Sequence, residues 1–496
     1  MEDPRQHGTF GRLHLRHTRN MMLMRMREQG TYAGEMEFEM GMAAAAEHDD
    51  ETAAEHFQLS ARLGNPQAQY ALACCYERGQ GVPQDSFQAT SWLRKAAGQG
   101  NVNAQFALGC VYNLGTAVRP SIKTAQKWWR RAARQGHPRA QYNLGIAQMR
   151  RKGDEGVAEA FVWFHKAAKA GNPESQYQLG RFYRNGKGLV QDLSEAFMWF
   201  QKAAKQGYPP AEFEVGLCFR DGIGIQEDQA KALKWLQKAA IHHDAPALYA
   251  LAIHYKKADI VSGYSTKTLR LLRKSVKQGY PPAEFELGVY FFDPDYGHRD
   301  MKKVIKWWSK AAEDGHSMAA HLLGCIYQNG LDVPEDKNEA FKWFQHGAKL
   351  GNTLSASMLG LCYLFGEGVS KDKTEAVKWF QYAAEQGNPE AIYYLGKCFH
   401  DGIGVLKDDL HAMECLRKAA EFGCADAQFE LGMCCYNGID IDKDPAAGIK
   451  WLDKAAKQGH ERAQATLEEL AGLGNEDAQI ALKTLSGSMD EQGLYA

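Results

Sequence analysis

A glycine that recurs about every 36 residues along the chain is the feature that most constrains its fold. It closes the phrase Lys-Ala-Ala-x-x-Gly in most copies, one interval is 35 residues, and His243 takes the glycine position in one copy. The glycines are Gly64, Gly100, Gly136, Gly171, Gly207, Gly279, Gly315, Gly351, Gly387, Gly423 and Gly459. A fixed period of this length is the signature of a solenoid or another repeat architecture. We therefore expect eleven full repeats between residues 64 and 458.

Each repeat predicts two helices joined by a glycine-containing loop. In the copy that begins at Gly387, Ala391, Leu395 and Phe399 follow one another at intervals of four residues, which places them on one face of a helix. The loop 402–404, Gly-Ile-Gly, is suited to ending that helix. A second helix then begins at an aspartate and carries an aromatic pair followed by Lys-Ala-Ala. The unit is thus a helical hairpin.

All eleven tryptophans lie in two adjacent positions of the second helix. The first position holds Trp92, Trp128, Trp163, Trp199, Trp235, Trp307, Trp343, Trp379 and Trp451, and the second holds Trp129 and Trp308. Leu271 and Cys415 replace tryptophan in the first position, and Phe or Leu is usual in the second. A large aromatic residue beside a pair of alanines favours packing of one hairpin on the next. A single hairpin cannot bury its own apolar face, so we expect stacked hairpins with the tryptophans in a continuous core.

The repeat resembles the Sel1-like repeat, a relative of the tetratricopeptide repeat. Residues 351–386 and 387–428 carry the pattern Gly-Asn-Pro-x-Ala-x-Tyr-x-Leu-Gly, the Gly-x-Gly-Val loop and Ala-x-x-Trp most clearly, and the resemblance covers roughly residues 30–485. It implies an all-α, right-handed α/α superhelical solenoid of about 12 helical hairpins. The tetratricopeptide repeat itself has a period of about 34 residues and is the weaker match.

The ends of a repeat array are expected to depart from the pattern, because they cap it. The repeat 243–278 and the loop near residue 297 also depart from the repeat pattern. Either a change of superhelical curvature at this place or simple sequence drift would account for the departure. We predict a flexible N-terminal segment, a degenerate capping repeat that includes a helix at 21–28, eleven repeats, two C-terminal capping helices and a flexible tail. These parts are residues 1–20, 21–63, 64–458, 459–485 and 486–496.

Charge and hydropathy exclude some classes of function. The formal net charge is −1, so no bulk attraction to nucleic acid or anionic membranes is expected, and no stretch is long and apolar enough to span a bilayer. We predict a cytoplasmic protein. The first 27 residues are rich in arginine and lack acids between Asp3 and Glu28, which leaves a mitochondrial presequence as the alternative.

No pattern of catalytic, cofactor-binding or metal-binding residues is recognised. Eight of the eleven cysteines fall at one turn of the first helix, and we interpret them as buried thiols in a reducing compartment. The cysteine-rich Helicobacter relatives pair cysteines within each repeat, but the matching partners are missing here. The Gly-x-Gly loops lack the Gly-Lys-Ser/Thr of a phosphate loop. We therefore expect neither a metal nor a cofactor.

A second aromatic position, in the first helix, is the best candidate for a binding surface. It holds Tyr70, Phe106, Tyr142, Tyr177, Phe213, Tyr249, Phe285, Tyr393 and Phe429, and is broken at His321 and Ser357. By analogy with tetratricopeptide repeats, it should approach a concave face, where it could form a groove for a peptide; packing between repeats is the other interpretation. The candidate partner-binding residues are Tyr142, Tyr177, Arg181, Arg184, Phe213, Arg220, Tyr249, Phe285, Tyr393, Lys397 and His400.

The family resemblance implies a non-enzymatic scaffold or adaptor that binds other proteins or peptides on its concave face. Two alternatives stay open. One is an enzyme of unseen chemistry, such as the penicillin-binding or β-lactamase-like activity associated with some relatives, although the Ser-x-x-Lys motif is not evident. The other is a bacterial secreted protein that interacts with a host.

Overall fold

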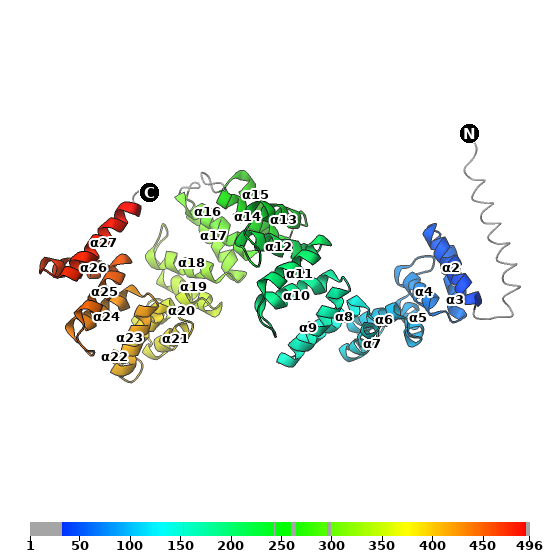
Figure 1. The fold of residues 1–496 in the computed structure, drawn as a ribbon, viewed down its shortest axis with the longest axis horizontal. Helices are drawn as coiled ribbons and strands as arrows, with labels where there is room; N and C mark the ends of the chain where they lie inside the picture. The colour runs from blue at the N-terminus through cyan, green and yellow to red at the C-terminus, as the bar shows by residue number, and fades with distance from the viewer. Residues whose placement is uncertain (1–31, 152, 243, 259–263, 295–298, 493–496) are drawn as a thin grey trace. The chain divides into compact units, whose positions relative to one another are not determined.

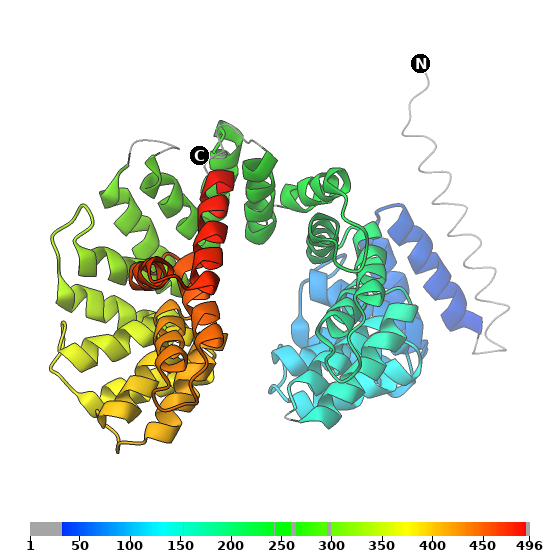
Figure 2. The ribbon, with the colours of Figure 1, turned by 60° about the vertical axis from the view of Figure 1, so that its left-hand side comes forward.

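The computed structural model describes residues 32–151, 153–242, 244–258, 264–294 and 299–492. Within these ranges the chain forms 26 helices and no strand, as an array of helical hairpins (Figures 1 and 2). The predicted all-α solenoid is thus confirmed. The expected N-terminal segment 1–20 and the expected helix at 21–28 lie outside the described residues. None of the described helices is long and apolar enough to cross a membrane.

Each hairpin pairs a first helix with the second helix that follows it. The first helices are α2 (Tyr32–Ala46), α4 (Pro66–Arg78), α6 (Val102–Leu114), α8 (Pro138–Met149), α10 (Pro173–Asn185), α12 (Pro209–Asp221), α14 (Ala245–Ala258), α16 (Pro281–Phe292), α18 (Ser317–Asn329), α20 (Thr353–Phe365), α22 (Pro389–Asp401), α24 (Ala425–Asn437) and α26 (Glu461–Gly472). The second helices are α3 (Asp50–Arg62), α5 (Ser86–Gly98), α7 (Ile122–Arg134), α9 (Asp154–Lys169), α11 (Leu193–Lys205), α13 (Gln229–Ile241), α15 (Thr266–Val276), α17 (Met301–Glu313), α19 (Lys337–Lys349), α21 (Lys373–Glu385), α23 (Asp409–Glu421), α25 (Pro445–Lys457) and α27 (Glu476–Gln492).

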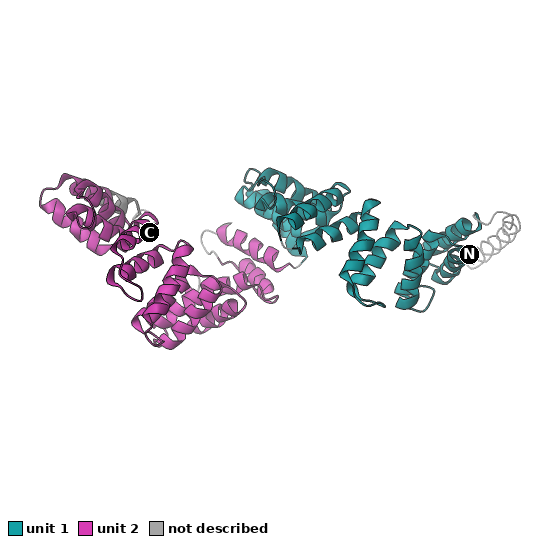
Figure 3. Cartoon of the chain, turned by 90° about the horizontal axis from the view of Figure 1, so that it is seen from below, with its two compact units in different colours: residues 1–242 teal, residues 243–496 magenta. Residues whose placement is uncertain are grey.

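The array divides into two compact units, residues 1–242 and 243–496 (Figure 3). The divergent repeat, with α14 and α15, begins the second unit. There Lys256 and Tyr264 both bond Glu286 of α16, at 2.7 and 2.5 Å. At the other end, α27 packs on α25 and α26 and includes the first part of the segment expected to be a flexible tail.

Local sequence explains where the helices begin and end. The Asn388 side chain accepts a hydrogen bond from the Ala391 amide at 2.8 Å, and Pro389 occupies the first turn of α22, where its missing amide costs nothing. Gly402 ends α22 in the left-handed conformation, with φ 64°. Asp408 then caps α23 by accepting from the His411 amide at 3.0 Å.

The second glycine of the Gly-x-Gly loop has a role beyond ending a helix. A Cβ atom on Gly404 would lie 2.3 Å from the backbone oxygen of Lys373, which is the first residue of the preceding second helix. Gly81, Gly224 and Gly368 make the same close approach in other hairpins. The loop of one hairpin therefore packs directly against the backbone of the hairpin before it, and only glycine leaves room for this contact.

The two aromatic positions of the second helix differ in burial, which corrects the expectation that the tryptophans as a set form the core. The second position is at most 4% exposed at Leu93, Trp129, Phe164, Phe200, Leu236, Leu272, Trp308, Phe344, Phe380 and Leu452. In the first position Trp199 is 7% exposed and the other tryptophans are half-buried. Trp128, for example, packs against the core of the preceding hairpin, and Arg131 covers its ring at 4.5 Å. Side chains at the first position thus pack between successive hairpins, whereas side chains at the second position fill the core.

Buried glutamines link several successive hairpins. The Gln105 side chain donates to the Ala97 backbone oxygen at 3.2 Å, at the end of the preceding second helix, and accepts from Gln135 at 2.9 Å. The same arrangement recurs at Gln69, Gln176 and Gln428. These bonds give the helix-end carbonyl a second donor, beside the backbone amide of the closing glycine, which lies 3.2 Å from the Ala97 oxygen at Gly100.

Candidate functional site

The aromatic position of the first helices packs inward and toward the next hairpin. The Tyr177 ring lies 5.7 Å from the Phe200 ring of its own hairpin and 5.5 Å from the Tyr208 ring at the start of the next one. Tyr249 meets Tyr280 in the same way at 5.5 Å. Most of these rings are half-buried, as Phe213 is, so one part of each ring packs between repeats and another part reaches solvent.

Histidines take part in this packing at several joints. The Phe285 ring stacks on the His316 ring at 4.3 Å, and His316 Nδ1 accepts the Ala319 amide at 3.2 Å. His137 repeats the arrangement beneath Phe106, and His460 beneath Phe429. Burial lowers the pKa of His316 and His137. His316 and His137 therefore serve as neutral N-caps and as stacking partners, and His460 caps and stacks in the same place with its Nε2 3.2 Å from Asp426.

In the first unit, the predicted arginines are engaged within the protein. Arg184 forms a 2.5 Å ion pair with Glu214 of the next hairpin. Arg181 lies over the Tyr177 ring of its own helix, 5.9 Å from the centroid. Arg220 pairs with Asp221 at 2.7 Å. Tyr142, the remaining predicted residue of this unit, lies 5.8 Å from the Phe164 ring. These side chains lie on the first helices, and each contacts another residue of the protein.

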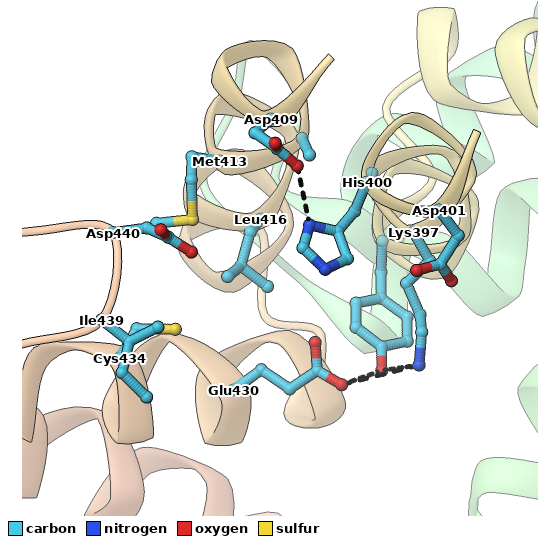
Figure 4. A pocket seen from close by; sticks show the side chains of 13 residues that line it. Lys397, His400, Asp401, Asp409, Met413, Leu416, Glu430, Cys434, Ile439 and Asp440 are labelled. Atoms are coloured by element: carbon cyan, nitrogen blue, oxygen red, sulfur yellow. Dashed lines mark hydrogen bonds and ion pairs between the residues drawn. The ribbon is translucent and has the colours of Figure 1, made fainter. Parts of the chain in front are cut away.

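In the second unit, three predicted residues, Tyr393, Lys397 and His400, meet in one pocket of about 430 Å³ (Figure 4). The pocket lies between α22, α23 and α24 and is bordered by the loop after α24. Figure 4 shows Lys397 and His400 facing Met413 and Leu416 across it. Its lining is Tyr393, Gly396, Lys397, His400, Asp401, Asp409, Ala412, Met413, Leu416, Glu430, Cys434, Ile439 and Asp440.

The pocket exists because the second helix of this hairpin lacks its usual aromatic pair. In the preceding hairpin a ring covers the glycine of the first helix, so that a Cβ on Gly360 would lie 2.5 Å from the Phe380 ring. At Gly396 the nearest atom is instead the Cys415 Cβ, at 3.0 Å. Cys415 takes the buried place, and Leu416 is left half-exposed in the pocket wall. The pocket thus occupies the space that an aromatic ring of the second helix would fill.

Hydrogen bonds and ion pairs orient the polar wall. The Tyr393 hydroxyl donates to Glu430 at 2.7 Å, and Lys397 Nζ lies 3.7 Å from the same carboxylate. Burial, and then the bond to Glu430, raise the pKa of Tyr393, so its hydroxyl stays protonated. His400 pairs with Asp409 at 3.0 Å. Asp401 and Asp440 are exposed at the edge of the pocket.

A sequence profile of the Sel1 repeat matches eleven segments of the chain: residues 33–65, 66–101, 102–137, 138–172, 173–208, 209–244, 281–316, 317–352, 353–388, 389–423 and 425–460. The chain belongs to the Sel1-repeat family. The resemblance inferred from the residues is thus confirmed. The first matched segment overlaps the stretch expected to be a degenerate cap. The hairpin of α14 and α15, which falls between two matched segments, is the divergent repeat noted in the sequence.

Solved structures of Sel1-repeat proteins resemble the chain. One is c5321, a protective antigen present in uropathogenic Escherichia coli strains, with 30% identity over 88% of this chain and 94% of that one, and a TM-score of 0.57. Another is a Sel1 repeat protein from Oxalobacter formigenes, with 29% identity over 62% of this chain and 90% of that one, and a TM-score of 0.46. No match is found among proteins with curated descriptions.

Much of the pocket in this Sel1-repeat protein was missed from the sequence. Glu430 and Asp440 come from the following repeat, so no pattern within one repeat unites them with Lys397. Met413 and Asp409 lie on the second helix, whereas all the predicted binding residues lie on first helices. One signal was present, because Cys415 interrupts the tryptophan position in the hairpin that forms the pocket.

The cysteines of this Sel1-repeat protein are poorly suited to nucleophilic chemistry. Burial raises the pKa of Cys362 to about 12 and that of Cys398 to about 11, so both are thiols rather than thiolates at neutral pH. In the described part of the chain, no group of three or more His, Cys, Asp or Glu side chains is placed to hold a metal ion.

Proposed function

We propose that this protein is a non-enzymatic scaffold that binds partner proteins through the exposed side chains of its first helices, with the pocket of α22, α23 and α24 as its principal recognition site. Sel1-repeat proteins are in general protein-interaction scaffolds. The observation that carries the proposal is the pocket itself, which forms where the residues of one hairpin depart from those that fill the core elsewhere. Recognition residues in a repeat protein are the ones that packing does not dictate.

The first helices supply such residues beside their packed aromatic position. Arg181, Lys397 and His400 are exposed, and Arg220 is half-buried. Long cationic side chains next to partly exposed rings are the combination that dominates binding energy at protein interfaces. A partner segment lying along these helices would contact several repeats at once.

We also propose that the protein works in a reducing compartment, the cytoplasm. Its eleven cysteines are free thiols in the described structure, and seven of them are buried. Intact mass measured without reductant on freshly isolated protein tests this proposal. Free thiols throughout are expected, whereas a mass lowered by disulfide formation would contradict it.

The binding proposal is tested with the full chain as bait for affinity capture and quantitative mass spectrometry. The test variant carries Leu416→Phe, which places a larger side chain in the pocket. The control carries Leu114→Phe, the same change at an exposed site at the end of α6. We expect at least one protein to be retained by the wild type and by the control but lost by the test variant, and to bind again when both partners are purified. Equal capture by all three chains would overturn the proposed site.

A further inference from the structure

We propose that the pocket between α22, α23 and α24 receives the side chain of an arginine in a peptide segment of the partner protein. The inference rests on the proposed scaffold function and names the chemistry that its principal site recognises. Three properties of the pocket lead to an arginine: its size, its apolar wall and the sign of its charge.

The size and wall of the pocket suit a long side chain with an aliphatic stem. Its volume of about 430 Å³ falls within the range of about 300–1,000 Å³ that is usual for ligand pockets. Met413, Leu416 and Ile439 form an apolar wall. The three methylene groups of an arginine would pack there while the charged end stays near water, as such side chains do on protein surfaces. Met413 is unbranched and adapts its shape to an occupant.

The charge of the lining favours a cation. Four carboxylates, Asp401, Asp409, Glu430 and Asp440, stand around the pocket against one lysine, Lys397. That lysine is 3.7 Å from Glu430, which is too long for a hydrogen bond, and donates to the Tyr393 hydroxyl at 3.4 Å. Asp409 is paired with His400 and with Lys407, which lies outside the lining. Asp401 and Asp440 lie at the edge on either side (Figure 4) and carry no ion pair in the described structure. An incoming cation would find carboxylates on both sides.

A guanidinium fits this arrangement better than an ammonium. It presents five N–H donors in one plane, so it can bond to carboxylates on different sides at once, and it stacks on aromatic faces. The Tyr393 ring forms part of the pocket, and its hydroxyl is already held by Glu430.

The surroundings indicate that the arginine belongs to a longer segment. Leu406 and Leu410 flank Asp409 in the chain and are 90% and 83% exposed. Neither side chain is used in packing the hairpin. They offer apolar contacts to the residues that precede or follow a docked arginine, which a free small cation would not use.

The test follows the Met413 methyl group by NMR in the full chain with labelled methionine methyls, the signal being assigned with Met413→Leu. The probe is N-acetyl-arginine-N-methylamide, which represents one arginine in a peptide. Its neutral counterpart is N-acetyl-citrulline-N-methylamide, which has the same shape without the charge. We expect a saturable shift of the Met413 signal with the arginine probe. The citrulline probe should bind about tenfold more weakly or worse, because hydrogen bonds to a charged group are the stronger ones.

Substitutions in and around the pocket show where the arginine probe binds. Leu416→Phe should fill the pocket and abolish the shift, whereas Leu114→Phe, the same change at an exposed site at the end of α6, should leave it intact. Asp401→Asn combined with Asp440→Asn keeps the fold, since both side chains are exposed, and should weaken binding severalfold. Equal binding of both probes, or an arginine shift that survives Leu416→Phe, would overturn the proposal.

The two proposals fail in different ways. If the arginine probe does not shift Met413 but captured partners are still lost with Leu416→Phe, the site is a protein-binding surface and the arginine specificity is wrong. If the probe binds as expected but capture is equal for all baits, the pocket takes arginine and the scaffold site is wrong.

Discussion

Two neighbouring hairpins, α20 with α21 and α22 with α23, have the same backbone arrangement but different side chains between their helices. In the first, Phe380 is fully buried over Gly360. In the second, Cys415 and Leu416 replace the aromatic pair, and a pocket opens beside Gly396. The caps and loops are alike in both, so the helices do not need the ring to form. A repeat protein can thus acquire a pocket when two side chains of one hairpin are replaced.

The largest expected effect concerns the ring that the second hairpin lacks. Phe380→Ala should lower the free energy of unfolding of its region by about 3–5 kcal/mol, because it removes a fully buried ring and leaves a cavity. Leu416→Ala should cost about 1 kcal/mol, because Leu416 is already half-exposed. Hydrogen exchange of the amides of α21 and α23 measures both, since repeats can unfold separately. Equal costs would show that the two hairpins are packed alike.

The next largest effect on stability is expected at Gly360 and Gly396, the glycines of the first helices that face these side chains. Gly360→Ala should destabilise its hairpin by about 1–3 kcal/mol, since the new Cβ would lie 2.5 Å from the Phe380 ring. Gly396→Ala, the matched change, meets only Cys415 and a backbone oxygen at 3.0 and 3.2 Å, and should cost less. Chemical denaturation followed by circular dichroism gives both values. A larger loss for Gly396→Ala would mean that the second hairpin is the tighter one.

A third substitution makes the side chains of the hairpin α22 with α23 more like those of the hairpin α20 with α21. Leu416→Phe should raise the free energy of unfolding by about 0.5–2 kcal/mol, because filling a cavity with a ring that the fold accommodates elsewhere adds burial. The same denaturation experiment measures the change, with Leu410→Phe as the exposed control. Destabilisation by Leu416→Phe alone would show that the space is not shaped for the ring found in the neighbouring hairpin.

The smallest effect compares two kinds of helix cap at equivalent positions, His316 and Asn388. Burial lowers the pKa of His316 below its unfolded value of about 6.5, so the folded state favours the neutral ring. Its contribution to stability is complete above that pH and is lost as the pH falls below it, by up to about 1 kcal/mol when the cap is broken.

His316→Asn should therefore flatten the decline of stability as the pH falls below about 6.5, because asparagine caps without titrating. Thermal unfolding across this range measures the effect, and His48→Asn at an exposed turn serves as control. An unchanged pH profile would exclude His316 as a source of acid sensitivity.

The sequence predicted what the repetition determines and missed what depends on side-chain volume. The period of Gly387 and its counterparts located the hairpins, because helix ends require particular backbone conformations. Adjacent positions such as Trp379 and Phe380 could not be ranked by burial, since both face the same side of the helix and only packing decides which ring enters the core. Three of the predicted binding residues line the pocket, but its acidic side, with Glu430, comes from the next repeat.

The glutamine links also bear on how such a chain can change length over evolution. Gln135 reaches Gln105, and Gln458 reaches Gln428, across the same separation of 30 residues. Duplicating or deleting one whole repeat would restore these partners at the new junction. Inserting a single residue within this separation would break the bond at that joint and leave a buried amide unpaired. Growth and loss by complete units therefore preserves these bonds at every joint that carries them.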